Sequence, residues 1–233
     1  MAALLKKDQP APKRAFITLE GIDGCGKSTQ ARLLAAALEQ AGREVLALRE
    51  PGGVRISEKI RALLLDPANA EMSNTCELLL YEAARAQLVA EVVAPALAAG
   101  KMVVCDRFYD STTAYQGHAN GMDLRLVGQA NAIAVGGCHP TLTLVYDVDP
   151  AVAAARRASR EEDRLEAKGL AYQERVAAGF RAAAAAEPDR VKLIPAHEDV
   201  AHVFRHTCGA LEAAGLAIPR EAARAAFLAN GGR

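Results

Sequence analysis

The sequence predicts an α/β fold in which a parallel five-stranded sheet is flanked by helices. Three observations lead to this prediction: short apolar runs typical of strands buried on both faces, helical patterns that alternate with them, and a glycine-rich turn between the first strand and the first helix. Such alternation places helices on both faces of a parallel sheet. Ligands bind at the carboxyl ends of the strands in such folds, so we expect the loops after the first three strands to hold the functional residues.

The predicted strands are short, and three of them are nearly all apolar. They lie at residues 15–20, 44–48, 102–105, 142–148 and 191–194. Helical patterns lie at residues 27–41, 56–65, 75–99, 123–135, 150–159, 165–186 and 200–214. Gly42 and Gly100 follow two of these helices, as expected for residues that end a helix. Asn74, three residues before Glu77, predicts a capping box, and Pro95 predicts a bend near the end of the longest helix.

Length and composition favour one domain. The chain has 233 residues, 51% of them hydrophobic, which is enough for one substantial core. We expect a flexible N-terminal tail at residues 1–13, one domain at residues 14–214 and a C-terminal extension at residues 215–233. Because chain ends are usually poorly ordered unless they dock, we expect the extension to be frayed.

Charge and cysteine usage indicate the partners and the compartment. The 28 basic and 28 acidic residues give a net charge of zero, so no global field attracts the chain to nucleic acid or to an anionic membrane. The five cysteines show no C-x-x-C spacing, which disfavours a disulfide framework and a zinc site. The N-terminal apolar stretch is too short for a signal peptide, and no later run spans a bilayer. We expect a cytoplasmic protein without a nucleic-acid or membrane partner.

The turn after the first predicted strand has the G-x-x-x-x-G-K-S pattern of a phosphate-binding loop. Its glycines let successive backbone N–H groups point into one concavity, and the following helix adds its positive N-terminal end. Lys27 can reach the β and γ phosphates of ATP, and Ser28 can ligate the accompanying Mg²⁺. A chance match is the alternative, but the strand before the turn and the helix after it disfavour that interpretation. The predicted ATP-binding residues are Gly21, Ile22, Asp23, Gly24, Cys25, Gly26, Lys27, Ser28 and Thr29.

Further polar segments follow the second and third strands. Asp106 and Arg107 close the third strand, where a carboxylate can hold a metal-bound water and an arginine can bind a second phosphate. A structural ion pair is the alternative. Residues 50–53, Glu-Pro-Gly-Gly, break the chain beside the cleft. Residues 111–117 group hydroxyls, a phenol and an amide, which suit a sugar and the edge of a base.

Together with residues 16–30 and 77–85, these segments resemble thymidylate kinases in order and spacing. The resemblance extends over about residues 14–214, and the combination of Glu-Pro-Gly-Gly, Asp-Arg and Ala-Tyr-Gln-Gly is far more specific than the phosphate loop alone. It implies a P-loop nucleoside monophosphate kinase fold. It also implies ATP- and Mg-dependent phosphoryl transfer to thymidine 5′-monophosphate (dTMP), giving thymidine 5′-diphosphate (dTDP) for dTTP synthesis.

The resemblance further implies a homodimer built on the long helix at residues 75–99. Apolar residues are spread broadly around this helix, which agrees with burial on more than one side. A simple core helix explains the same pattern, so both interpretations stay open.

The resemblance also implies an acceptor site. Tyr81 stands where the family usually has a phenylalanine stacked on the thymine ring, while Arg85 and Gln116 match positions that hydrogen-bond the base. Tyr115 matches the tyrosine that crowds the 2′ position of the sugar. The implied acceptor-site residues are Asp23, Arg61, Tyr81, Arg85, Arg107, Thr112, Tyr115 and Gln116.

Charge neutralisation is the main catalytic requirement. The acceptor phosphate is already anionic, so no general base is needed, and cations must offset its repulsion from the triphosphate. By resemblance, Arg61 and Arg107 hold the monophosphate, and Glu50 lies near the transferred group. Asp23 matches a carboxylate near the 3′-hydroxyl. The predicted catalytic residues are Lys27, Glu50, Arg107 and Arg160, and the predicted metal ligands are Ser28 and Asp106.

A basic lid is implied by one departure from the family pattern. Gly24 stands where some thymidylate kinases carry an arginine, while others supply that arginine from a lid. This chain resembles the second kind. Its predicted lid, about residues 156–166, contains Arg156, Arg157, Arg160 and Arg164. A solvated helix face is the alternative for any one of them, and the sequence does not choose which arginine reaches the triphosphate.

Two other functions stay open on the sequence alone. A kinase for a different pyrimidine or deoxynucleoside acceptor would differ mainly in the pocket. A nucleotide-dependent switch would need a water-positioning residue and switch loops, whereas this chain offers an arginine-rich lid and a base-binding pocket. Cys25 also has two interpretations: a reactive thiol activated by Lys27 and the helix N-terminus, or a small residue that fills the loop.

Overall fold

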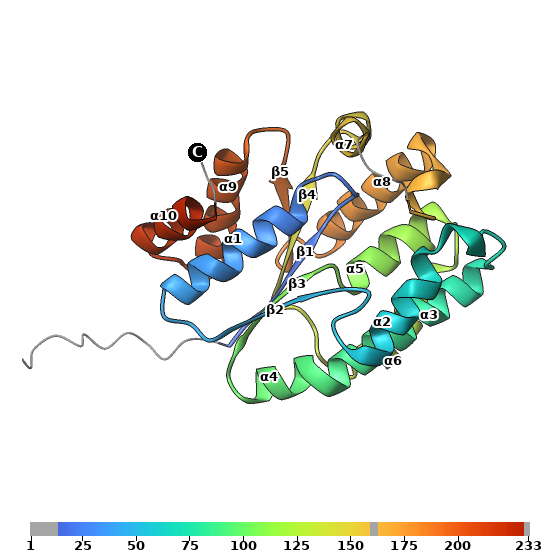
Figure 1. Ribbon diagram of the computed structural model, residues 1–233, viewed down its shortest axis with the longest axis horizontal. Helices are drawn as coiled ribbons and strands as arrows, with labels where there is room; N and C mark the ends of the chain where they lie inside the picture. Colours follow the sequence, from blue (N-terminus) through green and yellow to red (C-terminus); the bar gives the residue numbers. More distant parts are fainter. Residues whose placement is uncertain (1–13, 159–162, 231–233) are drawn as a thin grey trace, which may run out of the picture.

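The computed structural model describes residues 14–158 and 163–230. Its centre is a parallel sheet of five strands in the order β2-β3-β1-β4-β5 (Figure 1). The strands are β1 (Phe16–Glu20), β2 (Val45–Arg49), β3 (Met102–Asp106), β4 (Leu142–Asp147) and β5 (Val191–Pro195). Each strand agrees with its predicted range to within one residue at either end, so the predicted α/β fold is confirmed.

Helices cover both faces of the sheet, as Figure 1 shows. On one face lie α1 (Lys27–Gln40), α9 (Val200–Ala213) and α10 (Arg220–Ala229). On the other lie α3 (Asn74–Leu88), α4 (Ala94–Ala98), α5 (Tyr109–Thr112), α6 (Leu124–Val135) and α8 (Leu170–Ala186). Helix α2 (Arg55–Leu65) packs on α3, and α7 (Pro150–Arg157) follows β4.

The sheet register brings the functional segments to one edge. All residues of β1 are buried, which suits the central strand of a sheet covered on both faces. Asp106 at the end of β3 pairs with Leu19 of β1 and with Arg49 of β2. The carboxyl ends of these three strands therefore meet, and the loops that follow them share one space.

The predicted helix at residues 75–99 is divided in the structure. It consists of α3, a π-helical turn at Val89–Val93 and α4. Pro95, the residue expected to bend this helix, lies in the first turn of α4 and has no N–H to donate back along the helix. The π-helical turn lies just before it, so the helix is interrupted near the predicted position. The predicted cap was wrong: Ser73, not Asn74, is the N-cap, and its side chain accepts from the Cys76 N–H at 3.3 Å.

Two other segments differ from their predictions. The predicted helix at residues 165–186 contains a 3₁₀ turn at Glu166–Lys168 and begins anew at α8, because Gly169 has a φ of 83° that ends the turn. The polar segment after β3 was expected to be a loop. It is helical instead, with α5 followed by a π-helical stretch at Thr113–Ala119.

The end of the chain docks on the domain. We expected a frayed extension, but α10 packs against α1. The ring of Phe227 stacks on that of Phe204 with centroids 6.4 Å apart, and Ala226 is fully buried. Apolar contact therefore orders residues 220–229, whereas the expectation of fraying rested only on their position at the end of the chain. Within the described residues, no helix combines the length and apolar character required to cross a membrane.

Candidate functional site

The phosphate-binding loop connects β1 to α1. Gly24 and Gly26 have φ values of 88° and 94°, a region that side chains with a Cβ rarely adopt. A Cβ on Gly24 would also lie 2.3 Å from the Ala153 carbonyl oxygen of α7. Both observations explain why this loop carries no arginine at position 24.

Lys27 lies across the loop at the start of α1. Its Nζ donates to the Ile22 carbonyl and to Asp23 Oδ1, each at 3.2 Å, and the residue is only 5% exposed. Burial acts to raise the pKa of Asp23, but the charges of Arg107 and Lys27 outweigh it and hold that pKa well below its usual range. The Asp23 carboxylate is therefore an anion that keeps two cations together.

Ser28 and Asp106 form a hard oxygen donor set beside the loop. The Ser28 hydroxyl donates to Asp106 Oδ2. Among the residues that the structure describes, the buried Oδ1 of Asp106 has no hydrogen-bond partner. A hydroxyl and a carboxylate at the mouth of a phosphate loop are ligands that suit Mg²⁺, so the residues present fit this ion.

Arg107 lies between the ends of β1 and β3. It has a φ of 74°, an uncommon backbone conformation for a non-glycine residue and one that tends to occur at functional sites. Its guanidinium donates to the Gly21 carbonyl at 3.1 Å, to Ser111 Oγ at 3.0 Å and to Asp23 Oδ1 at 2.6 Å. The side chain is therefore held in place before any ligand binds.

Glu20 supports this arrangement, and the sequence analysis missed it. The buried carboxylate accepts from the Phe108 N–H at 2.7 Å and from Ser111 Oγ at 2.6 Å. Burial, reinforced by the charge of Asp110, raises the pKa of Glu20 to about 8. The sequence did contain a pattern that could have identified Glu20: it is a carboxylate at the end of an apolar strand, as Asp106 is.

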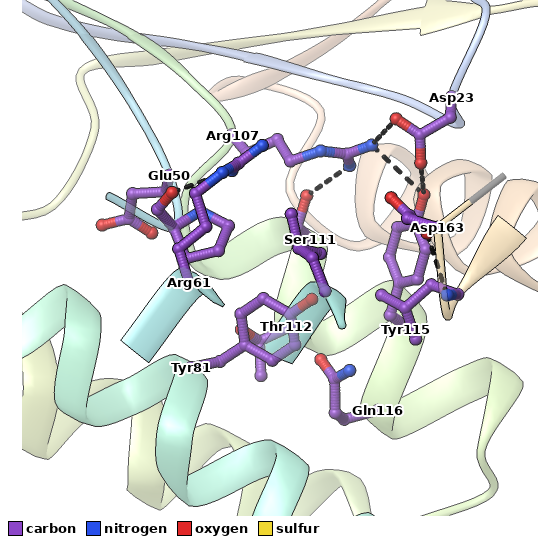
Figure 2. A pocket seen from close by; sticks show the side chains of 13 residues that line it. Asp23, Glu50, Arg61, Tyr81, Arg107, Ser111, Thr112, Tyr115, Gln116 and Asp163 are labelled. Carbon is purple, nitrogen blue, oxygen red and sulfur yellow. Dashed lines mark hydrogen bonds and ion pairs between the residues drawn. The ribbon is translucent and has the colours of Figure 1, made fainter. Parts of the chain in front are cut away.

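Two cavities meet at these residues. The larger, of about 410 Å³, is lined by loop residues that include Gly24, Gly26, Lys27, Ser28 and Thr29. The smaller, of about 80 Å³, is lined by Tyr81, Ser111, Thr112, Tyr115 and Gln116 among others (Figure 2). Both are lined by Asp23, Glu50, Arg61, Arg107 and Asp163. A ligand in one cavity would therefore touch the same charged groups as a ligand in the other.

The smaller cavity has an aromatic and polar wall. Figure 2 shows Tyr81 on the opposite side of this space from Tyr115 and Gln116. The Tyr115 hydroxyl lies 3.3 Å from Asp23 Oδ2 and accepts from Arg107 at 3.3 Å. Burial raises the pKa of both phenols above their ordinary value, so both hydroxyls stay protonated. An aromatic face beside an amide and hydroxyls can hold a nucleobase and its sugar.

Arg85 lies behind this wall rather than in it. It is 2% exposed, and it donates to Glu50 Oε2 at 2.9 Å, to Thr112 Oγ1 at 3.0 Å and to Glu82. Burial raises the pKa of Glu50 to about 7, against the opposing charge of Arg85. Arg61 donates to the Pro51 carbonyl at 2.9 Å and lines both cavities. The structure thus brings seven of the eight predicted acceptor-site residues to one cavity wall and leaves Arg85 underneath it.

Comparisons with known proteins agree with this geometry. Residues 19–206 match the family model described as thymidylate kinase. The chain belongs to the thymidylate kinase family. It is 50% identical over 189 residues to the thymidylate kinase of Solidesulfovibrio magneticus, covering 78% of this chain and 90% of that protein. It is 48% identical over 192 residues to the thymidylate kinase of Geobacter sulfurreducens, covering 79% and 90%.

A solved structure extends the likeness to the fold. The thymidylate kinase of Ehrlichia chaffeensis superposes with a TM-score of 0.72 at 33% identity, covering 86% of this chain and 99% of that one. The activity of this thymidylate kinase family member is the phosphorylation of dTMP to dTDP, and the family uses ATP. The alternative of a nucleotide-dependent switch is therefore wrong.

The predicted lid of this thymidylate kinase family member contributes two arginines to the larger cavity. Arg156 donates to the Ala196 carbonyl at 3.1 Å, and Arg157 donates to the Asp23 carbonyl. Arg164 points elsewhere: it donates to the Leu64 carbonyl at 2.8 Å and lies 2.7 Å from Glu77. Arg160, the predicted catalytic arginine, lies outside the described residues.

Three residues of the predicted ATP-binding loop do not line the larger cavity. Ile22 and Cys25 are part of the hydrophobic core, and Gly21 lies close to the backbone of Tyr146 in β4. Burial raises the pKa of the Cys25 thiol despite the charge of Lys27 nearby. A Cβ on Gly21 would lie 2.8 Å from Cys25 Sγ. Burial in the core and the raised pKa both favour the interpretation that Cys25 fills the loop over that of an activated thiol.

Proposed function

We propose that the two joined cavities hold the two nucleotides of one phosphoryl transfer, with ATP in the larger and dTMP in the smaller. One observation carries this proposal: the cavities share Asp23, Glu50, Arg61, Arg107 and Asp163 along their common border. The γ phosphate of ATP and the phosphate of dTMP would lie next to each other at that border. Transfer in line between two bound nucleotides requires this arrangement.

Charge and position supply the catalysis in this proposal. The acceptor oxygen is anionic, so these residues remove no proton and instead offset repulsion between the two nucleotides. Lys27 would leave Ile22 and Asp23 to contact the β and γ phosphates of ATP, while Arg107 and Arg61 would hold the phosphate of dTMP. Glu50 lies at the same border and would orient groups near the transferred phosphate.

Ser28 and Asp106 would hold Mg²⁺, as the donor set fits that ion. When bound, the ion would neutralise charge on the β and γ phosphates. The other predicted ATP-binding residues belong to the phosphate-binding loop around Lys27. Their backbone N–H groups would face the triphosphate.

The base and sugar would lie against the wall of the smaller cavity. Tyr81 would stack on thymine, and Gln116 would hydrogen-bond its edge. Tyr115 crowds the position next to Asp23, which would favour deoxyribose over ribose. Thr112 completes the wall, and Arg85 would act from behind it by holding Thr112 and Glu50 in place.

A lid arginine would complete the cation cluster around the transferred phosphate. Arg156 and Arg157 already line the larger cavity. Arg160 remains our candidate for the catalytic lid arginine, at a position between them and Asp163 in sequence. An arginine placed beside a transferring phosphoryl group stabilises charge that develops there.

Product analysis tests the proposal. With ATP, Mg²⁺ and dTMP, we expect dTDP and ADP in equal amounts, and no transfer after chelation of the metal by EDTA. A panel of monophosphates at equal concentration separates dTMP from other pyrimidine and deoxynucleoside acceptors. ADP formed without dTDP, or equal turnover of an unrelated monophosphate, would contradict the proposed occupancy of the smaller cavity.

We also propose that the chain forms a homodimer through α3 and α6, which pack side by side. Leu79 of α3 is 59% exposed, and Leu126 and Ile133 of α6 are 50% and 84% exposed. Apolar side chains gathered on adjoining helices are typical of an interface. Ile133→Asp should therefore yield monomers in light scattering, while Leu228→Asp, at an exposed site on α10, should not.

The organisation and location of the chain are further proposals. Residues 14–214 would form the kinase domain, with the lid at about residues 156–166 and the segment 215–233 as an extension whose helix α10 supports α1. All five cysteines are free, in agreement with a reducing compartment. We therefore propose a cytoplasmic location. Fractionation of cells that express the chain would test it.

A further inference from the structure

Glu77 of α3 lies between the smaller cavity and the predicted lid, and it is 1% exposed. Its Oε1 accepts from Gln116 Nε2 at 2.7 Å and from Asn120 Nδ2 at 2.9 Å. Its Oε2 lies 2.7 Å from Arg164 and 3.5 Å from Lys168. Two hydrogen-bond donors and two cations therefore surround this buried carboxylate.

This arrangement determines which way the Gln116 amide points. An ionised carboxylate only accepts hydrogen bonds, so the Gln116 group that faces Glu77 must be the NH₂. Burial opposes ionisation, but the hydrogen bond from Gln116 and the charges of Lys168 and Arg164 keep the pKa of Glu77 below its ordinary value. Turning the amide over would direct its carbonyl oxygen at the carboxylate, so that two acceptors would face each other with no hydrogen between them.

The opposite end of the same amide faces the smaller cavity. Gln116 lines that cavity, and Figure 2 shows its oxygen on the side of Tyr81. Within the described part of the chain, the hydrogen bond to Glu77 is the one that the Gln116 side chain makes. The carbonyl oxygen is thus an acceptor presented to whatever lies against Tyr81.

We propose that Glu77 is a positioning residue that sets base specificity: it holds the Gln116 amide so that a carbonyl oxygen faces the base, which selects a base with a ring N–H. Thymine and uracil carry a hydrogen on N3, whereas the N3 of cytosine is an acceptor. Cytosine would place one acceptor against another. The proposal rests on the proposed occupancy of the smaller cavity by a nucleoside monophosphate.

The test compares kcat/KM for dTMP, dUMP and dCMP in the wild-type protein and in Glu77→Gln. The amide introduced at position 77 can present either its oxygen or its nitrogen to Gln116. The Gln116 amide can therefore turn over and donate a hydrogen bond to N3 of cytosine. We expect the dTMP-to-dCMP ratio of kcat/KM to fall about 10-fold or more, the size of one well-made hydrogen bond to a base. The dTMP-to-dUMP ratio should stay constant, because both bases carry the N3 hydrogen.

The ratios separate positioning from a merely structural role. Damage to the fold would lower kcat/KM for all three nucleotides together and leave both ratios unchanged. Glu187→Gln is the control, because Glu187 also pairs with an arginine, Arg190, but does not contact Gln116 and lines neither cavity. If Glu77→Gln does not fold, the double variant with Arg164→Met removes the cation left without its partner and allows the same measurement.

The inference and the proposed function fail in different ways. A wild-type protein that does not phosphorylate dTMP contradicts the proposed function. A wild-type protein that prefers dTMP, together with a folded Glu77→Gln that keeps the same dTMP-to-dCMP ratio, overturns the role of Glu77 and leaves the proposed function intact.

Discussion

The donor side and the acceptor side of this site are built in different ways. Six of the fourteen residues that line the larger cavity come from one short segment, residues 23–29, and Asp106 lies beside it. The smaller cavity is lined by separate elements: the loop after β1, α2, α3, the helical segment after β3 and the predicted lid. A continuous motif carries its own backbone geometry. An assembled wall depends on how distant elements pack, and buried ionisable residues such as Glu20, Glu50 and Glu77 hold it together.

The two cavities also differ in size. A volume of about 80 Å³ is well below the usual range for small-molecule pockets, whereas about 410 Å³ lies within it. Leu65, Asp163 and Leu165 narrow the smaller cavity, and the contact between Arg164 and Glu77 holds that part of the predicted lid against it. The structure therefore presents a smaller space on the acceptor side than on the donor side.

The largest expected effect comes from the donor side. Lys27→Ala should lower kcat by about 10²- to 10³-fold, because it removes a preorganised donor to the transferring phosphate. The KM for dTMP should change little, since Lys27 lines only the larger cavity and not the smaller one. Steady-state kinetics check both quantities. Lys101→Ala is the control, because Lys101 lies before β3 at the opposite edge of the sheet and pairs with Glu44.

The next effect concerns the border between the cavities. Arg107→Lys keeps the charge but loses the forked hydrogen bonds to Gly21, Ser111 and Asp23. We expect the KM for dTMP to rise about 10- to 100-fold while the KM for ATP changes about threefold or less. Arg125→Lys, at an exposed position of α6, should change neither constant. Equal increases in both KM values would contradict the separation into two sides.

The same contrast explains what the sequence could predict. The strands, the phosphate loop and five of the helices, α1, α2, α6, α7 and α9, follow from local periodicity and from glycines at fixed spacing, so their bounds were predicted to within two residues. Glu77 was interpreted as a helix cap, because its partners Gln116 and Arg164 are distant in sequence. Arg85 was placed in the pocket by resemblance, and its contacts with Glu50 and Thr112, which hold it behind the wall, exist only in the folded chain. Docking of α10 likewise depends on the surface that α1 and α9 offer.

A third prediction concerns stability on the acceptor side. Glu20 has an ordinary pKa of 4.5, and in the folded protein its pKa is raised to about 8. Between these values the folded state binds more protons than the unfolded state, so the contribution of Glu20 to stability falls as pH rises. Relative to Glu20→Gln, the wild-type free energy of unfolding should decrease by about 1–3 kcal/mol between about pH 5 and about pH 8.

Urea unfolding at several pH values measures this difference. Glu44→Gln is the matched control, because the Glu44 side chain is 79% exposed and its variant should follow the wild-type profile. Parallel profiles for wild type and Glu20→Gln would show that the folded protein does not hold a proton on Glu20. The acceptor side would then lack the buried, pH-sensitive support that distinguishes it from the donor side.

The smallest expected effect tests whether the Tyr81 hydroxyl contributes to the acceptor wall. Within the described residues, that hydroxyl has no hydrogen-bond partner in the structure, so the ring face is the group that would act on the base. Tyr81→Phe should change kcat/KM for dTMP by about threefold or less, since it removes at most one weak hydrogen bond. Tyr81→Leu should lower it about 10-fold or more, because stacking on the base is lost. A large loss in Tyr81→Phe would mean that the hydroxyl reads the nucleotide, and the acceptor wall would then select its substrate by polar contacts on both faces.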